Sequence, residues 1–172
     1  SNTQLLSFII QKATGTTLSE YASEKLWKPI GAELDAQWSL DHKEGVEKAY
    51  CCFYSNARDF ARIGKLFLNK GKWNGKQIVS EDYVRQSITP APINDKGKPN
   101  TTYGYQWWLT NYQGMEVFYA RGILGQYIFV IPELKIVFVR LGHKRGEKDG
   151  DGQLLDVPVY LSEVVKMYSL KK

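Results

Sequence analysis

The sequence has little of what metal and redox sites are built from. Among its 172 residues are two cysteines and two histidines. The cysteines, Cys51 and Cys52, are adjacent, and neighbouring cysteines rarely reach the geometry of an unstrained disulfide. Two thiols and two separate histidines also make no zinc spacing. We therefore expect two small buried cysteine side chains, no metal and no cofactor.

Several catalytic and membrane signatures are also absent from the sequence. There is no Gly-x-Ser-x-Gly elbow, no Gly-rich phosphate loop, no His-Glu-x-x-His and no Cys-x-x-Cys. His42 and His143 lie among charged residues, which favours solvated surface histidines over a general base. No apolar run is long enough to span a bilayer. We expect no transmembrane segment, and any export signal or lipid anchor would lie on another part of the protein.

The charge is mildly positive and unevenly placed. There are 23 Lys and Arg residues against 18 Asp and Glu residues, a formal net charge of +5. The basic clusters at residues 70–76 and 143–148 lack the aromatic residues and motifs of a nucleic-acid site. They are therefore expected to be solvated loops, with no nucleic-acid partner. At 43% hydrophobic residues, the chain can bury a substantial core.

Helical patterns dominate the first half of the sequence. Apolar residues predict a mostly buried helix that begins at Ser1 or Asn2 and ends at Thr14-Gly15. Thr17 and Glu20 have the spacing of a capping box, which predicts the start of a second helix. An ordered connection over residues 31–52, with one short strand, is expected to help shape a pocket.

Two more helices are predicted before the character of the sequence changes. Asn56 precedes an apolar stripe as a helix cap, and Ser80 caps a short helix that ends before Pro90. Beyond residue 100, four runs of aromatic and β-branched residues predict an antiparallel meander. These runs are residues 103–109, 116–121, 126–131 and 135–141.

A terminal helix is predicted from Asp156, because Pro158 is tolerated in a first turn. Helices, an antiparallel sheet and a last helix together predict an α+β fold, with the antiparallel sheet flanked by helices. We expect residues 1–172 to form a single partial domain.

Several segments in order resemble one protein family. They are Ser1-Asn2-Thr3-Gln4-Leu5-Leu6, Thr14-Gly15, Glu24-Lys25-Leu26-Trp27-Lys28-Pro29-Ile30-Gly31-Ala32, Ser55-Asn56-Ala57-Arg58-Asp59-Phe60-Ala61-Arg62, Gly71-Lys72-Trp73-Asn74-Gly75-Lys76-Gln77-Ile78-Val79-Ser80, Tyr103-Gly104-Tyr105-Gln106-Trp107-Trp108 and Ala120-Arg121-Gly122-Ile123-Leu124-Gly125-Gln126. They resemble the region after the catalytic tyrosine in the serine β-lactamase-related, penicillin-binding-protein-like hydrolases, and within these the 6-aminohexanoate-oligomer hydrolase and esterase-like branch. The resemblance implies the C-terminal portion of the β-lactamase/transpeptidase-like fold.

The resemblance also implies a catalytic serine paired with lysine in Ser-x-x-Lys, and a Tyr-x-Asn element. We expect this chain to lack Ser-x-x-Lys, the missing N-terminal portion of the parent to supply the nucleophile, and this chain alone to be inactive. Asn2 would be the asparagine of Tyr-x-Asn. Tyr54-Ser55-Asn56 spells the same element, but it matches a different family segment, so we expect Asn56 to be a helix cap.

The third family motif, on a sheet strand, corresponds to Ala120-Arg121-Gly122. By resemblance, the Ile123 N–H would help to form the oxyanion hole, and Arg121 and Gly122 would contact substrate. Gly122 has no Cβ, so the backbone could approach a reacting carbonyl, although an ordinary glycine at a strand start is an equally good local interpretation. Ala120 replaces the usual lysine and cannot pair with a β-lactam carboxylate, which favours an esterase or amidase.

The resemblance therefore implies hydrolysis of a small-molecule ester or amide through an acyl-enzyme, in the periplasm or cell envelope. Two alternatives stay open. One is a non-catalytic peptide- or glycan-binding domain whose aromatic cleft includes Trp107, Trp108 and Tyr127. The other is a structural domain whose basic loops contact an anionic surface.

Overall fold

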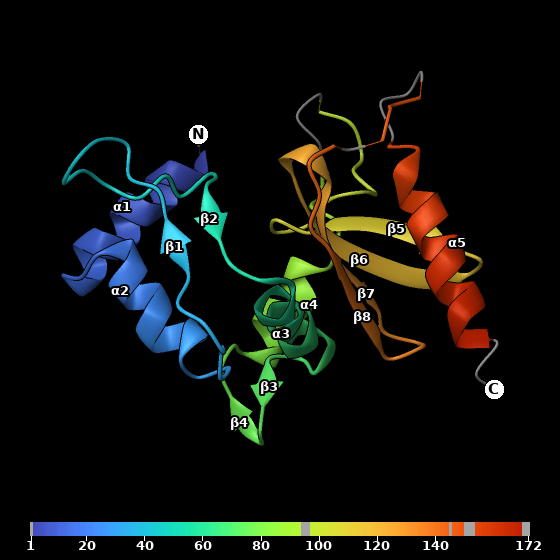
Figure 1. Cartoon of the computed structure of the whole chain (residues 1–172), viewed down its shortest axis with the longest axis horizontal. Helices are drawn as coiled ribbons and strands as arrows, with labels where there is room; N and C mark the ends of the chain where they lie inside the picture. Colours follow the sequence, from blue (N-terminus) through green and yellow to red (C-terminus); the bar gives the residue numbers. More distant parts are fainter. Residues whose placement is uncertain (1, 94–96, 145, 150–153, 170–172) are drawn as a thin grey trace. The chain divides into compact units, whose positions relative to one another are not determined.

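The computed structural model describes residues 2–93, 97–144, 146–149 and 154–169. The chain divides into two compact units, Ser1–Val84 and Arg85–Lys172, called here the first and second units. Figure 1 shows the elements of each unit.

The first unit consists of helices and two small hairpins. Its elements are α1 (Asn2–Thr14), α2 (Leu18–Ala22), the π-helix η1 (Ser23–Trp27), β1 (Gln37–Trp38), β2 (Phe53–Tyr54), α3 (Ala57–Leu68), β3 (Lys72–Trp73) and β4 (Lys76–Gln77). The pairs β1–β2 and β3–β4 are antiparallel. The helix α4 (Glu81–Ser87) begins in the first unit and ends in the second, because the units divide between Val84 and Arg85.

The predicted helix caps are confirmed. Thr17 and Glu20 form a reciprocal capping box at α2, with the Thr17 N–H donating to the Glu20 carboxylate at 2.9 Å. The Asn56 side chain accepts from the Asp59 N–H at the start of α3, and Ser80 accepts from the Tyr83 N–H. Asn56 is thus a helix cap, as predicted, because its side-chain oxygen satisfies an N–H that the first turn leaves unpaired.

Asp59 ties α3 to the segment that follows η1. Its side chain is fully buried. It accepts from the N–H groups of Glu33 (2.8 Å) and Leu34 (3.1 Å), from the Asn56 amide (2.6 Å) and from the Arg62 guanidinium (2.9 Å). Burial raises the pKa of Asp59, but these donors outweigh it and hold the pKa below its ordinary value.

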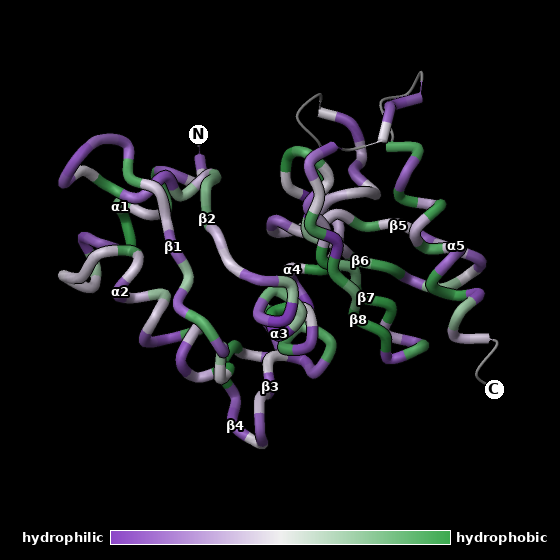
Figure 2. The backbone as a smooth tube through the Cα atoms, viewed as in Figure 1, coloured by the Kyte–Doolittle hydropathy of each residue, from purple (hydrophilic) through white to green (hydrophobic). Residues whose placement is uncertain are grey.

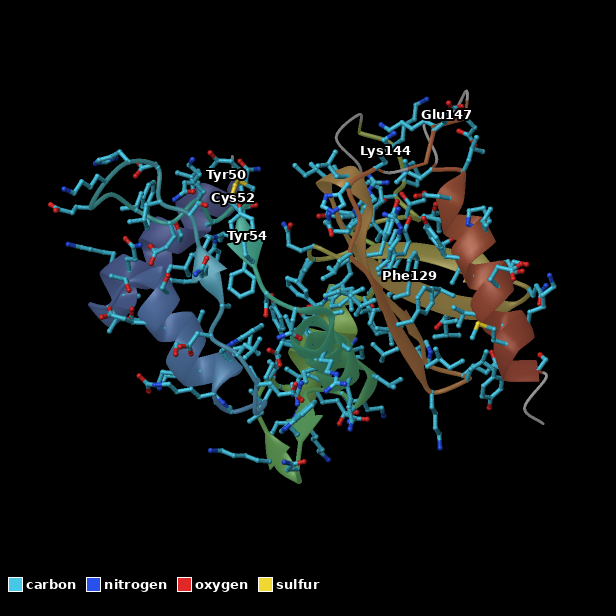
Figure 3. The ribbon with its side chains drawn as sticks, viewed as in Figure 1. Tyr50, Cys52, Tyr54, Phe129, Lys144 and Glu147 are labelled. Atoms are coloured by element: carbon cyan, nitrogen blue, oxygen red, sulfur yellow. A yellow bond between two sulfur atoms is a disulfide. The ribbon has the colours of Figure 1, made fainter. Side chains whose placement is uncertain are left out.

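Two expectations about the first unit are wrong. The first is that α1 is mostly buried: of its described residues, the buried one is Ser7, whereas its leucines, phenylalanine and Ile9 are exposed. The second concerns Cys51 and Cys52, which are half-buried and joined by a disulfide (Figure 3). Cys52 has a left-handed φ of 65°. Sequence spacing alone does not predict this backbone conformation at a non-glycine residue.

The second unit is a four-stranded antiparallel sheet with one helix on its face (Figure 1). Its elements are β5 (Trp108–Tyr112), β6 (Met115–Gly122), the 3-10 turn η2 (Ile123–Gly125), β7 (Gln126–Ile131), β8 (Ile136–Arg140) and α5 (Asp156–Ser169). The sheet order is β5-β6-β7-β8. The predicted meander and terminal helix are confirmed, and the chain is α+β.

The core of the second unit lies between the sheet and α5. Tyr119, Phe129 and Phe138 stack across three strands, with ring centroids 5.0 and 4.5 Å apart, and Val157 and Leu161 of α5 pack against this cluster. Figure 2 shows the apolar character of β7 and β8, and Figure 3 labels Phe129. Side chains alternate along a strand, so Tyr119 faces α5 and its neighbour Ala120 faces the other side.

The first predicted strand lies later than expected. Residues 103–109 were predicted as a strand, but β5 begins at Trp108. The reason is a tight turn before it: the Gly104 N–H donates to the Trp107 carbonyl at 2.8 Å, and Gln106 has a left-handed φ of 66°. A Cβ at Gly104 would clash with the Ser87 carbonyl oxygen, so the backbone there depends on glycine.

Candidate active site

The end of β6 carries three of the four residues predicted for the site. Arg121 and Gly122 are the last residues of β6, and Ile123 begins the turn η2. Gly122 pairs with Gln126 as the last pair between β6 and β7. Ile123 is 74% exposed, so its backbone lies at an open strand end and not in a sealed core.

The Ile123 N–H is well placed to be a donor. It belongs to the first residue of η2, and the first N–H groups of a helical turn have no partner inside that turn. No side chain caps the turn. A backbone N–H fixed in this way can stabilise negative charge on a carbonyl oxygen. The arrangement is chemically suited to half of an oxyanion hole.

Two side chains that the sequence did not point to hold this turn in place. The Arg140 guanidinium donates to the Gly125 carbonyl oxygen. The Gln126 side chain donates to the Gly142 carbonyl oxygen and accepts from the Gly142 N–H. Leu124 and Gly125 both have left-handed φ values, 58° and 79°. The last residue of β8 and Gly142, two positions beyond it, thus brace the turn from outside.

Arg121 packs against an aromatic ring. Its guanidinium lies 3.5 Å from the centre of the Trp108 ring, a cation–π contact. Burial raises the pKa of Tyr119, and Arg121 counteracts this shift. Arg121 therefore lies on the Tyr119 face of the sheet, opposite Ala120.

Asn2, the fourth predicted residue, is the first residue of α1 and is exposed. It belongs to the first unit, whereas Ile123 belongs to the second.

One serine does have lysine three positions later, outside the segments that carry the resemblance. Ser169-Leu170-Lys171-Lys172 spells Ser-x-x-Lys at the end of the chain. The Ser169 hydroxyl donates to the Val165 carbonyl at 3.0 Å in the last turn of α5, and Lys172 lies outside the described residues. The hydroxyl satisfies a helix carbonyl, which is an ordinary role at a helix end.

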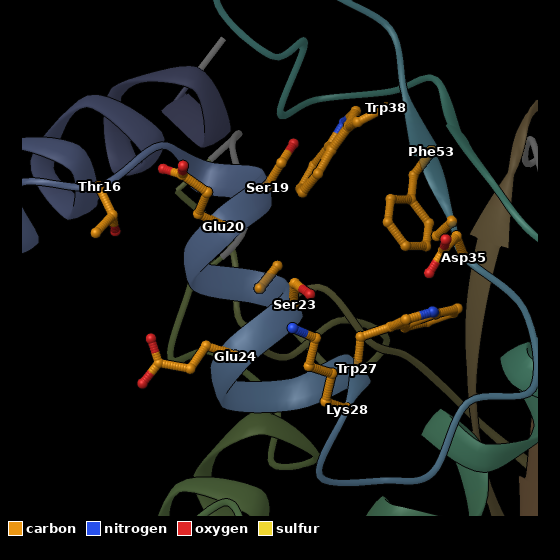
Figure 4. A pocket seen from close by; sticks show the side chains of 12 residues that line it. Thr16, Ser19, Glu20, Ser23, Glu24, Trp27, Lys28, Asp35, Trp38 and Phe53 are labelled. Carbon is orange, nitrogen blue, oxygen red and sulfur yellow. The ribbon is translucent and has the colours of Figure 1, made fainter.

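A hollow of about 690 Å³ lies in the first unit (Figure 4). Ser19, Ser23 and Lys28 line one side of it, from α2, η1 and the residue after η1. Trp38 and Phe53 form an aromatic wall, with ring centroids 5.1 Å apart. Since Trp38 lies in the connection over residues 31–52, this connection does help to shape a pocket, as predicted.

Of the three aromatic residues expected to line a binding cleft, Trp108 lines a hollow of the second unit, whereas Trp107 and Tyr127 do not. Trp107 and Tyr127 are 5% and 2% exposed and belong to the interior of the second unit. Trp107 packs edge to face on Phe118, and the Tyr127 hydroxyl donates to the Asp156 carboxylate at 3.0 Å. These two aromatic side chains stabilise the fold and do not line an open surface.

Tyr127 is expected to make the free energy of unfolding fall as the pH becomes alkaline. Burial, followed by the hydrogen bond to Asp156, raises the pKa of Tyr127 well above its ordinary value. The folded state therefore keeps Tyr127 protonated while the unfolded state ionises above pH about 10. We expect wild type to be more stable than Tyr127→Phe by about 1.5 kcal/mol at pH 8, the scale of a hydrogen bond to a charged group.

This advantage should shrink above pH about 10, by up to about 1.4 kcal/mol for each further pH unit. Urea unfolding of both proteins at pH 8 and pH 10.5 measures the difference. If the difference in unfolding free energy between wild type and Tyr127→Phe were larger at pH 10.5 than at pH 8, the raised pKa of Tyr127 would be contradicted.

The described residues lack two kinds of feature. Over residues 2–93, 97–144, 146–149 and 154–169, no group of three or more His, Cys, Asp or Glu side chains could hold a metal ion. Within the same ranges, none of the helices combines the length and the apolar character that crossing a membrane requires.

The fold and the strand-end turn define a class of protein, and comparison with known proteins identifies it. The sequence matches the Beta-lactamase family over residues 1–157. A 6-aminohexanoate-dimer hydrolase from Paenarthrobacter ureafaciens is 30% identical over 148 residues, which cover 82% of this chain and 37% of that protein. The chain therefore belongs to the Beta-lactamase family.

Solved structures support the same assignment. A candidate 6-aminohexanoate-dimer hydrolase from Bacillus anthracis superposes with a TM-score of 0.76 at 30% identity, covering 95% of this chain and 41% of that one. A beta-lactamase from Mycobacterium bovis has the same fold, with a TM-score of 0.66 at 19% identity over 96% of this chain and 62% of that one. The chain spans about two fifths of the length of the two 30%-identical relatives.

Proposed function

We propose that this chain provides the oxyanion side of a serine hydrolase that cleaves small ester or amide substrates through an acyl-enzyme. The observation that carries the proposal is the exposed turn after β6, where the Ile123 N–H has no partner within its turn. The nucleophile, a serine with its lysine, would come from polypeptide that has no counterpart among the segments matched here.

The proposed reaction has two steps. The serine Oγ attacks the carbonyl carbon and gives its proton to the lysine and tyrosine pair, while the carbonyl oxygen becomes an oxyanion held by the Ile123 N–H. The alcohol or amine leaves with a proton and an acyl-enzyme remains. Water then attacks the acyl carbonyl, and the free acid and the serine hydroxyl are restored.

The substrate class follows from position 120. Ala120 lies on β6 two residues before Gly122 and has no charge with which to hold a β-lactam carboxylate. The relative from Paenarthrobacter ureafaciens is named for the 6-aminohexanoate dimer. We propose a short amide or ester over a β-lactam as the substrate, with Asn2 and Gly122 near the reacting group and Arg121, on the opposite face of β6, holding the strand through Trp108.

Replacing Ile123 tests the role of its N–H. The test protein is a chimera of the Bacillus anthracis relative. In it, the segment that matches this chain is replaced by this chain. Ile123→Pro removes the N–H, and proline is tolerated at the first position of a helical turn. We expect turnover of a nitrophenyl ester to fall about 10²–10³-fold, as for other single oxyanion donors.

Ile123→Ala is the matched control, because it removes the same exposed side chain and keeps the N–H. It should retain turnover within a fewfold of the parent. Equal turnover of the proline and alanine variants would overturn the role of the N–H. The 172-residue chain alone should neither hydrolyse the ester nor react with a fluorophosphonate probe.

A further inference from the structure

Helix α1 packs against its own unit through its polar side. Ser7 is buried, and Gln4 and Gln11 lie three and four residues to either side of it, so the three share a helix face. The Gln4 amide donates to the Glu47 carbonyl at 2.9 Å and accepts from the Ala49 N–H at 3.0 Å. Hydrogen bonds from polar side chains therefore hold this side of the helix against its unit.

Glu47 completes this polar attachment. It is 4% exposed, and its carboxylate accepts from the Gln11 amide at 3.2 Å and from the Ser19 N–H at 2.9 Å. Burial raises the pKa of Glu47, but the bonds from Ser19 outweigh this and lower it overall. An ionised buried carboxylate thus links α1 to the start of α2.

The apolar side of α1 faces away from this attachment. Leu5, Leu6, Phe8 and Ile9 are between 46% and 61% exposed. They are three or four residues apart in pairs, so they form one continuous surface, called here the α1 face. Surface helices normally bury such a stripe, and a contiguous exposed one marks an interaction site.

Asn2 lies on the same side of the helix. It precedes Leu5, Leu6 and Ile9 by three, four and seven residues, which places it in line with them along the helix. Whatever covers the α1 face therefore passes next to Asn2.

We infer that the α1 face is the docking surface for the portion of the hydrolase that carries the catalytic serine, and that this portion presents an apolar helix to it. The inference rests on the proposed function. About three fifths of each 30%-identical relative has no counterpart in this chain, and that portion of the relatives is long enough to cover such a face. Docking there would place the serine-bearing portion beside Asn2.

The test is co-expression of this 172-residue chain with the part of the Bacillus anthracis relative that it does not match. A tag on this chain captures the complex. We expect equimolar recovery with wild type and at least a tenfold lower recovery with Leu5→Glu/Ile9→Glu. The melting temperature of the variant chain alone should equal that of wild type, because both side chains are exposed.

Met167→Glu is the matched control, since Met167 is an equally exposed apolar side chain on α5, at 61%. It should leave recovery unchanged. Equal recovery with Leu5→Glu/Ile9→Glu would overturn the inference. So would a wild-type chain that self-associates through this face, or that binds neutral phosphatidylcholine vesicles through it, in preference to the serine-bearing portion.

Fluorophosphonate labelling of the captured complex separates this inference from the proposed function. A complex that depends on Leu5 and Ile9 but is never labelled would overturn the hydrolase proposal and support the docking surface. A labelled complex that forms equally well with Leu5→Glu/Ile9→Glu would do the opposite.

Discussion

Asp59→Asn is expected to lower the free energy of unfolding of the first unit by about 3–5 kcal/mol, the range for removing one partner of a buried ion pair. All four groups around the Asp59 carboxylate are donors: two backbone N–H groups, the Asn56 amide and the Arg62 guanidinium. An asparagine side chain would turn two N–H donors toward them. It would also leave Arg62, 22% exposed at its side chain, without its buried counter-charge.

Urea unfolding followed by tryptophan fluorescence measures this loss, since Trp27 lies in the core of the first unit. Asp35→Asn is the control, because Asp35 is an exposed carboxylate, and it should change stability by less than about 0.5 kcal/mol. A loss of unfolding free energy below about 1 kcal/mol for Asp59→Asn would contradict the stabilising role of the four hydrogen bonds to the Asp59 carboxylate.

The pH dependence gives a second check on Asp59. Its folded pKa lies below the unfolded value, so its contribution is present above pH about 4 and is lost as pH falls through the folded pKa. The stability gap between wild type and Asp59→Asn should therefore narrow only below pH about 4. A gap that is constant down to pH 2 would assign the loss to packing and not to charge.

Local signals in the sequence predicted the elements of the fold well. Thr17 with Glu20, Asn56 and Ser80 each predicted a helix start that the structure confirms. Each cap accepts a hydrogen bond from the N–H group three positions later, so the information needed is contained in a few neighbouring positions.

Non-local properties could not be predicted in the same way. The periodicity of α1 reveals an apolar face, but not what covers it, and its burial was wrongly expected. Trp107 and Trp108 are adjacent and alike in sequence, yet one is buried and the other stacks with Arg121. Which side of a strand faces the core depends on elements far away along the chain.

The candidate site shows the same division. A motif pointed to Gly122 and Ile123 as candidates, whereas no motif pointed to Arg140, which holds the turn. Arg140 is fifteen residues from the carbonyl that it holds. Pairing of β7 with β8 brings the two together, with Tyr127 opposite Arg140. No short pattern in the sequence contains this relation.

Gly125→Ala is expected to cost about 2–5 kcal/mol of unfolding free energy, from the left-handed backbone together with a steric clash. Gly125 has a φ of 79°, and a Cβ there would overlap the Arg140 guanidinium and approach the Lys144 carbonyl oxygen at 2.5 Å. The guanidinium must then move away from the Gly125 carbonyl, so the turn loses its brace as well as its conformation.

Gly114→Ala separates the two contributions, because Gly114 has a φ of 85° in the β5–β6 turn and nothing within 4 Å of its added Cβ. It should cost only about 1–2 kcal/mol, for the backbone alone. Urea unfolding of both variants measures the difference. In the hydrolase assembled for the Ile123 experiment, Gly125→Ala should also reduce ester turnover about 10²-fold, since a small displacement of a catalytic donor has an effect of this size. Equal stability losses for the two variants, with turnover retained, would show that Arg140 does not hold the Ile123 turn in its working position.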